Sequence, residues 1–217
     1  TITEVRMDPK TLADVQRHIA QLVRLYKEQH TGQYRLVERC RNAEFAVLFD
    51  DLYILGSNDS EDWAENFEGV YTPAVEIMRA KAHSGFVKHA NTVLEGLGDR
   101  AVGIKRVIGH SLGGAAAQVI GAMMGLPVIT FGSPRVWRHG AVPVTSGFHH
   151  IRVWDRRDII VGIPTCLRWQ HYEHERLVFG GHWFVAFLSR LFTRTPQITH
   201  HLETSYALEI DKLVSDG

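Results

Sequence analysis

The chain has 217 residues, of which 45 % are hydrophobic and 22 % are charged, a balance typical of a globular domain with a substantial core. Lysine plus arginine and aspartate plus glutamate each number 24, so the formal net charge is zero. A neutral chain argues against a nucleic-acid partner and against a polybasic membrane anchor. No apolar run approaches the roughly 20 residues of a membrane-spanning helix.

The start of the chain and its two cysteines leave the compartment open. The polar N-terminus at Thr1 has no signal-peptide core, so we expect a secreted protein if a signal peptide is removed before Thr1, and a cytoplasmic one otherwise. Cys40 and Cys166 cannot form a disulfide framework, and the sequence does not tell whether they are bonded.

The predicted elements alternate between helices and strands. Asp8-Pro9 predicts a capped helix start, followed by apolar residues at helical spacing: Leu12, Val15, Ile19, Leu22, Val23 and Tyr26. The apolar runs 45–49 and 52–55, separated by Asp50-Asp51, predict a β-hairpin. The remaining elements, in chain order, are a helix at 86–97, a strand at 104–108, a helix at 115–124, strands at 128–131 and 149–154, two runs that could pair at 167–169 and 176–179, and closing helices at 183–192 and 201–213. This alternation predicts an α/β fold with a mostly parallel central sheet flanked by helices, as a single domain over residues 1–217.

The strongest chemical signal is Gly109-His110-Ser111-Leu112-Gly113, a G-x-S-x-G motif between an apolar strand and an alanine-rich helix. The turn from strand to helix is too tight for side chains at the two glycines, and it holds the serine in a strained conformation with its oxygen presented to substrate. Ser111 is therefore the predicted nucleophile of an α/β-hydrolase fold. The N–H of Leu112, at the positive end of the helix, is a predicted oxyanion donor, and His110 is expected to pack beside the nucleophile.

A serine hydroxyl needs a base and a carboxylate that orients the base, and in this fold they follow in the order serine, acid, histidine. Two aspartates, Asp155 and Asp158, follow the predicted strand at 149–154. The histidines beyond them are His171, His174, His182, His200 and His201. The residue types alone leave both choices open.

Five further segments resemble, in order, motifs of the class 3 lipases, the fungal-type triacylglycerol lipase family. They are residues 53–66 for G-[ST]…[DN]-W-x-x-N, 82–86 for H-x-G-F, 130–136 for F-G-x-P-R-V, 151–158 for R-V…D and 201–206 for H-x-x-x-x-Y. Five ordered segments are far more specific than one pentapeptide, and the N-terminal helix adds nothing to the resemblance.

The resemblance implies roles for particular residues. Asp158 stands at the position of the family's acid, whereas Asp155 is expected to form a surface ion pair with the arginines that follow it. His201 stands at the position of the base, with His200 as the alternative if the alignment slips by one residue. Ser57 is the implied second oxyanion donor.

The segment at about 58–71 corresponds to the lid of that family. Trp63 and Phe67 lie four residues apart, and Val70 follows three later, so one helical face would carry all three. The opposite face is acidic, which would repel anionic membranes.

The sequence thus predicts a serine hydrolase that cleaves lipid esters through an acyl-enzyme, a triacylglycerol lipase or carboxylesterase acting on lipid at an oil–water interface. No cofactor is needed. The alternatives are a phospholipase A1, a serine peptidase or thioesterase, and a catalytically inactive lipid-binding protein with the same fold. The short spacing of His171 and His174 suggests a metal site. No further ligand motif accompanies them, so no metal is predicted.

Overall fold

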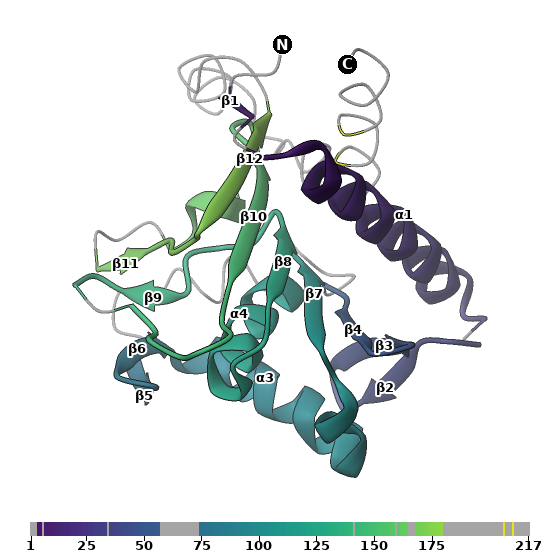
Figure 1. The fold of residues 1–217 in the computed structure, drawn as a ribbon. Helices are drawn as coiled ribbons and strands as arrows, with labels where there is room; N and C mark the ends of the chain where they lie inside the picture. Colours follow the sequence, from purple (N-terminus) through teal and green to yellow (C-terminus); the bar gives the residue numbers. More distant parts are fainter. Residues whose placement is uncertain are drawn as a thin grey trace, which may run out of the picture.

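The computed structural model describes residues 4–5, 7–33, 35–56, 74–140, 142–158, 160–164, 168–179, 206 and 210 (Figure 1). Its elements are β1 (Glu4–Val5), α1 (Pro9–Thr31), β2 (Glu38–Cys40), β3 (Ala43–Leu48), β4 (Asp51–Ile54), β5 (Ala74–Ile77), β6 (Ala80–His83), α3 (Ser84–Leu97), β7 (Arg106–His110), α4 (Leu112–Met124), β8 (Val128–Phe131), β9 (Trp137–Arg138), β10 (His150–Asp155), β11 (Trp169–Gln170) and β12 (Glu175–Phe179), with short 3₁₀ helices at Gly98–Gly103 and Ile160–Gly162.

The large sheet runs in the order β1-β12-β10-β8-β7-β4-β3-β2 over the described strands. The strands from β12 to β4 pair in parallel, and β1, β3 and β2 add antiparallel edges. A smaller antiparallel sheet, β11-β9-β6-β5, lies beside it. Parallel strands all end at one edge of a sheet, so the segments that follow β4, β7 and β10 converge there.

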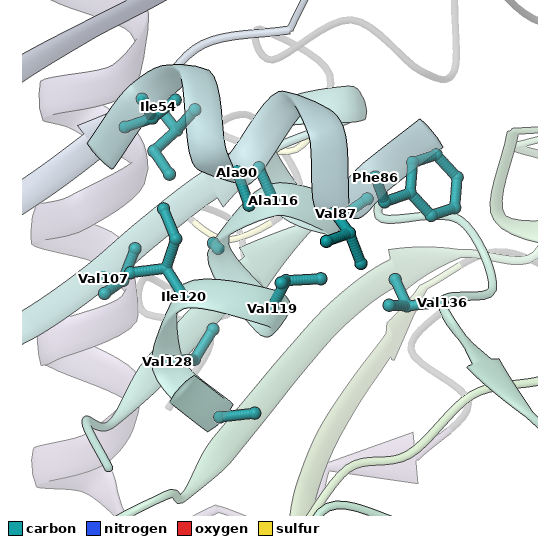
Figure 2. Packing of buried hydrophobic residues seen from close by; sticks show 14 of the residues in the cluster. Ile54, Phe86, Val87, Ala90, Val107, Ala116, Val119, Ile120, Val128 and Val136 are labelled. Carbon is teal, nitrogen blue, oxygen red and sulfur yellow. The ribbon is translucent and has the colours of Figure 1, made fainter. Parts of the chain in front are cut away.

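Successive residues of the central strands point to opposite faces of the sheet, and both faces are covered. On β4, Leu52 and Ile54 pack on the α3 and α4 side, whereas Tyr53 and Leu55, the residue after the strand, join the cluster under α1. Figure 2 shows the first of these clusters, in which aliphatic side chains of α4 fill the space between the sheet and α3.

Helix α1 is fixed at its start by a cap and along its length by a buried stripe. The Asp8 carboxylate accepts the N–H groups of Lys10 and Thr11 at 2.9 and 3.1 Å. The buried residues recur at spacings of three and four: Val15, His18, Ile19, Leu22, Leu25, Tyr26 and Gln29. Although α1 is 23 residues long, neither it nor any other described helix has the apolar length to cross a membrane.

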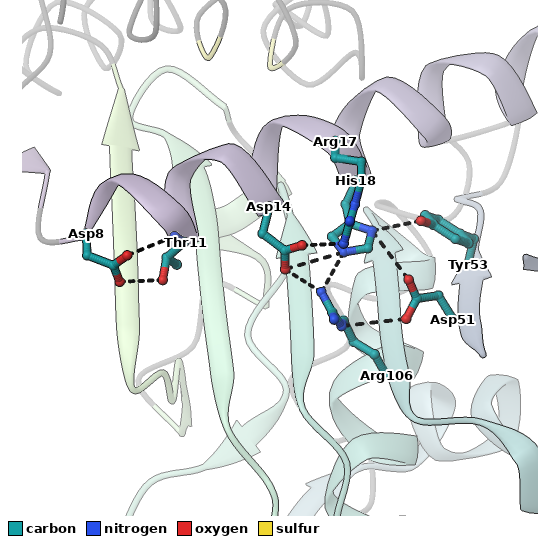
Figure 3. Close-up of polar contacts among 8 residues, drawn as sticks. All are labelled: Asp8, Thr11, Asp14, Arg17, His18, Asp51, Tyr53 and Arg106. Atoms are coloured by element: carbon teal, nitrogen blue, oxygen red, sulfur yellow. Dashed lines mark hydrogen bonds and ion pairs between the residues drawn. The ribbon is translucent and has the colours of Figure 1, made fainter. Parts of the chain in front are cut away.

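In its amino-terminal half, α1 meets the sheet through a polar network (Figure 3). His18 Nδ1 lies 2.7 Å from Tyr53 Oη, and Arg106 Nη1 donates to His18 Nε2 at 2.7 Å and also contacts the Asp14 carboxylate. Since arginine only donates, Nε2 accepts and the neutral ring donates from Nδ1 to Tyr53. Asp51 lies 3.6 Å from Arg106 Nε. Asp51 and Arg106 are the first residues of β4 and β7, at the edge opposite to the convergence described above.

The α/β fold with its mostly parallel sheet is confirmed, and so are the capped N-terminal helix, the hairpin of β3 and β4, and the helices at α3 and α4. The suggested pairing of 167–169 with 176–179 is wrong. β12 pairs in parallel with β10, whereas Trp169 belongs to β11, which pairs with β9 in the small sheet. The two runs are neighbours in the sequence and both apolar, but apolar composition does not specify which strand a strand pairs with. Of the closing helices, only Tyr206 and Ile210 are described, both helical and buried.

Candidate active site

The carboxyl edge of the sheet brings together three of the segments that the sequence singled out. Ser111 directly follows β7, Asp158 lies three residues beyond β10, and Gly56 lies two residues beyond β4. All three strands belong to the parallel part of the sheet, which is why residues more than 100 positions apart in the chain reach one edge.

Ser111 occupies the strained turn that its motif predicts. Its φ of 56° and ψ of −126° fall in a region that residues with side chains rarely adopt. The turn is held by hydrogen bonds from the Ser111 N–H to the Phe131 carbonyl at 3.0 Å and from the Ala115 N–H to the Ser111 carbonyl at 3.1 Å. The conformation thus results from backbone contacts on both sides of the serine.

The two glycines of the motif are required by close backbone approach. A Cβ on Gly109 would lie 2.3 Å from the Gly113 carbonyl oxygen. A Cβ on Gly113 would lie 2.2 Å from the Ile54 carbonyl oxygen, at the end of β4. Both distances are too short for any side chain, so the glycines let α4 start directly against β4 and β7.

Ser111 is 2 % exposed, and its Oγ has no hydrogen-bond partner among the residues that the structure describes. Leu112 is the first residue of α4, where N–H groups have no intrahelical acceptor and the helix dipole favours negative charge. The geometry therefore supports Leu112 as the oxyanion donor that the motif predicts, while Ser57, the second predicted donor, lies outside the described residues.

Asp158 is a buried carboxylate, 3 % exposed, held by donors on both oxygens. The Tyr206 hydroxyl donates to Oδ2 at 2.6 Å, and the Ile160 N–H donates to Oδ1 at 2.8 Å. Burial, reinforced by the Asp158 charge, raises the pKa of Tyr206 well above 10, so the phenol stays protonated and donates. Tyr206 entered the sequence analysis only as the last position of a motif; its bond to the carboxylate was not foreseen.

Asp155 is occupied by another partner. Its carboxylate accepts from the Arg157 backbone N–H at 2.8 Å and from Arg157 Nε at 2.9 Å. The ion pair agrees with the expectation for this residue, but Asp155 itself is buried and not on the surface. Its backbone N–H donates to Tyr206 Oη at 3.2 Å.

Two of the five histidines downstream of Asp158 are described. His171 is mostly buried, with Nε2 at 2.7 Å from the Val161 carbonyl and at 2.9 Å from Arg152 Nη2, and burial lowers its pKa well below 6.5. His174 is exposed, and its ring stacks on that of His149 at 4.8 Å. His182, His200 and His201 lie outside the described residues.

No group of three or more potential metal ligands occurs in the described part of the chain, and His171 and His174 face different partners. Cys40 carries a free thiol, half-buried at the end of β2. The predicted lid residues Trp63 and Phe67 fall in 57–73, outside the description.

His110 packs beside the nucleophile, as expected, but its partner was missed by the sequence analysis. Its Nδ1 lies 2.8 Å from the hydroxyl of Tyr26 on α1, and the two rings meet edge to face. Tyr26 was predicted only as part of the apolar stripe of the helix. Its spacing on that stripe revealed its burial, but a stripe does not reveal what the hydroxyl would bind.

Comparison with known proteins agrees with this geometry. The family described as Lipase (class 3) matches residues 52–168, more than half of the chain. The structure is similar to the Lip2 lipase from Yarrowia lipolytica, with a TM-score of 0.57 and 17 % identity over 83 % of each chain. It is also similar to Rhizomucor miehei lipase in complex with its propeptide, with a TM-score of 0.53 and 19 % identity over 81 % of this chain and 72 % of that one. A search of curated proteins finds no significant match.

Proposed function

The chain belongs to the class 3 lipase family, and on that premise we propose that it hydrolyses lipid esters through an acyl-enzyme on Ser111, with His201 as base and Asp158 as the orienting carboxylate. Membership of the family makes the protein a serine ester hydrolase of the α/β-hydrolase fold. The roles of individual residues are proposed from the geometry of the carboxyl edge.

The reaction proceeds in two half-reactions. Ser111 Oγ attacks the ester carbonyl carbon while His201 takes the serine proton, and collapse of the tetrahedral intermediate expels the alcohol, which receives that proton from His201. A water molecule then attacks the acyl-enzyme with His201 again as base, and the acid leaves as Ser111 regains its proton. Asp158 holds the tautomer of the histidine and stabilises the imidazolium.

The observation that carries the proposal is the backbone of Ser111. A non-glycine residue with a φ of 56°, between two glycines that tolerate no side chain and at the first turn of a helix, is costly unless the turn has a use. In a nucleophile turn of this kind, Oγ and the N–H of the next residue, here Leu112, serve the same carbonyl, which acyl transfer through an oxyanion requires. Asp158, held on both oxygens, is a rigid acceptor for a histidine.

Labelling with a fluorophosphonate tests the nucleophile directly, and Ser111→Ala is expected to abolish both labelling and ester turnover. Ser133→Ala is the matched control, because Ser133 is also buried beside α4, where its Oγ accepts from Gln118 at 2.8 Å. It should keep near-normal turnover. Retention of labelling in Ser111→Ala would contradict the assignment.

The substrate is proposed to be presented at an oil–water interface. The support is the pattern of Trp63, Phe67 and Val70 on one face of an acidic segment, which has two places to bury its apolar side, the pocket or lipid. We expect activity to rise steeply when a triglyceride passes its solubility limit, and Trp63→Ala to lower activity on the emulsion more than on p-nitrophenyl butyrate. Equal losses on both substrates would refute an interfacial role, and a preference for phospholipid would instead indicate a phospholipase A1.

A further inference from the structure

Both backbone polar groups of Gly56, the residue before the proposed oxyanion donor Ser57, are held by side chains of α1. The Gly56 N–H donates to Tyr26 Oη at 2.5 Å. Gln29, one turn further along α1, donates from Nε2 to the Gly56 carbonyl at 3.4 Å and also contacts the buried Glu44 carboxylate on β3. The loop leaving β4 is thus held by the N-terminal helix at the two successive peptide units that meet at Gly56.

The same tyrosine hydroxyl also reaches the nucleophile turn. Tyr26 Oη lies 2.8 Å from Nδ1 of His110, the residue before Ser111. One oxygen atom therefore joins the residues that precede the proposed oxyanion donor and the proposed nucleophile. Tyr26 is 4 % exposed and His110 is also 4 % exposed, so neither contact competes with bulk water.

The two joined segments are in direct contact. A Cβ on Gly56 would lie 2.9 Å from Ser111 Cβ and 3.0 Å from Tyr26 Oη, so the Gly56 backbone packs against the nucleophile itself. A shift of the loop by a fraction of an ångström would change the distance between the oxyanion donor and the attacked carbonyl. Misplacement by 1 Å costs a reaction roughly a hundredfold in rate.

We propose that Tyr26, supported by Gln29, is a positioning residue for ester hydrolysis, setting the loop at Gly56 against the Ser111 turn so that both oxyanion donors face one point. The inference rests on the proposed function. It assigns a catalytic purpose to α1, which lies outside residues 52–168 and outside the motif resemblance.

A purely structural role would look different. Removing the Tyr26 hydroxyl leaves the buried Gly56 N–H without this acceptor and removes the bond to His110, but the aromatic ring still fills the stripe under α1. The fold is then retained while the loop is free to move. The chain offers a matched control in Tyr53 on β4, whose hydroxyl also bonds a histidine Nδ1 between α1 and the sheet, at 2.7 Å. That histidine, His18, contacts Arg106 at the start of β7 and not the Ser111 turn.

The test compares Tyr26→Phe with Tyr53→Phe. Steady-state kinetics on p-nitrophenyl butyrate should show kcat of Tyr26→Phe lowered about 10- to 100-fold with KM changed less than threefold, because the loss is felt in the transition state. The rate of phosphorylation by diethyl p-nitrophenyl phosphate should fall in proportion, since that reaction uses the same oxyanion donors. Tyr53→Phe should keep kcat within twofold while its Tm falls as much as that of Tyr26→Phe.

Active-site titration with the same phosphate ester corrects each rate for the fraction of folded enzyme. If Tyr26→Phe does not fold, Gln29→Met, which removes only the contact to the Gly56 carbonyl and to Glu44, should lower kcat several-fold with KM unchanged. Equal kcat values for the Tyr26 and Tyr53 variants, or an unchanged Gln29→Met, would overturn the inference while Ser111 still labels. A wild-type enzyme that neither labels nor hydrolyses esters would overturn the proposed function, and this inference with it.

Discussion

Helix α1 meets the sheet twice through the same pair of groups, a tyrosine hydroxyl and a histidine Nδ1, and we propose different roles for the two contacts. In the amino-terminal half of the helix, His18 bonds Tyr53 at 2.7 Å; about two turns further along, Tyr26 bonds His110 at 2.8 Å. Both pairs are buried. Chemical identity of the contact therefore does not tell what it does.

The difference lies in the groups to which each pair is attached. His18 also contacts Arg106, which in turn pairs with Asp14, and these charged side chains join the helix to the sheet. Tyr26 also accepts the Gly56 N–H, and Gly56 packs against Ser111, whose backbone is strained. We therefore expect substitutions around His18 to change stability, and substitutions around Tyr26 and Ser111 to change turnover.

The largest effect is expected at His201. His201→Ala should lower kcat by about 10⁵- to 10⁶-fold, because removing the base from a triad costs about as much as removing the nucleophile. His174→Ala, at an exposed histidine, should retain most activity. The measurement is kcat per titrated active site. A large loss in His200→Ala with none in His201→Ala would move the base by one residue.

Asp158→Asn should lower kcat by about 10³- to 10⁴-fold, since the amide favours the wrong histidine tautomer. Asp155→Asn is the informative neighbour, because its carboxylate pairs with Arg157. It should lower the free energy of unfolding more than it lowers turnover, measured by urea denaturation and ester kinetics. Comparable losses of kcat in the two variants would leave the acid unassigned.

A smaller effect is expected at Tyr206, which donates to Asp158 Oδ2. Loss of a hydrogen bond to a charged group costs about 1.5–3 kcal/mol. When all of that energy is lost from the transition state, Tyr206→Phe lowers kcat by roughly 10- to 100-fold. Stability should fall too, because the Asp155 N–H loses its acceptor. Turnover equal to wild type, with only a lower Tm, would place Tyr206 with the residues around His18, whose substitution is expected to change stability.

The smallest effect on turnover, and one visible mainly as a pH dependence of stability, is expected at His18. Burial lowers the pKa of His18 below its ordinary 6.5, with Arg106 and Arg17 acting in the same direction and Asp14 opposing them. Below pH 6.5, His18 is protonated in the unfolded chain but stays neutral in the folded protein. The free energy of unfolding therefore falls as the pH is lowered.

His18→Asn should make that fall shallower by at most one proton, or about 1.4 kcal/mol per pH unit. Urea denaturation between pH 7 and pH 4.5 measures the slope, while kcat at pH 7 should stay near wild type. The slope will not vanish, because burial also lowers the pKa of His83 and His89 to about 4. A slope identical to wild type would contradict the assignment of a neutral, buried His18.

The sequence by itself determined the features that depend on local sterics and on period. The nucleophile turn could be identified because a strand, two glycines around a serine and a helix describe one short stretch of chain, and the structure confirms that neither glycine tolerates a Cβ. The alternation of strands and helices determined the fold class for the same reason. The choice of the orienting acid could be narrowed to two residues, Asp155 and Asp158, because both closely follow a predicted strand.

Only the tertiary structure decided which distant groups meet. Tyr206 bonds Asp158 across 48 positions, and Tyr26 bonds His110 across 84. β12 pairs with β10, and not with the run just before it, because a crossover connection allows parallel pairing that adjacency in sequence conceals. The apolar stripe of α1 predicts that Tyr26 faces inward. The partners of its hydroxyl, however, lie at the ends of β4 and β7, far away in the sequence. Hydrogen bonds to such distant groups depend on tertiary distances, which a periodic pattern does not contain.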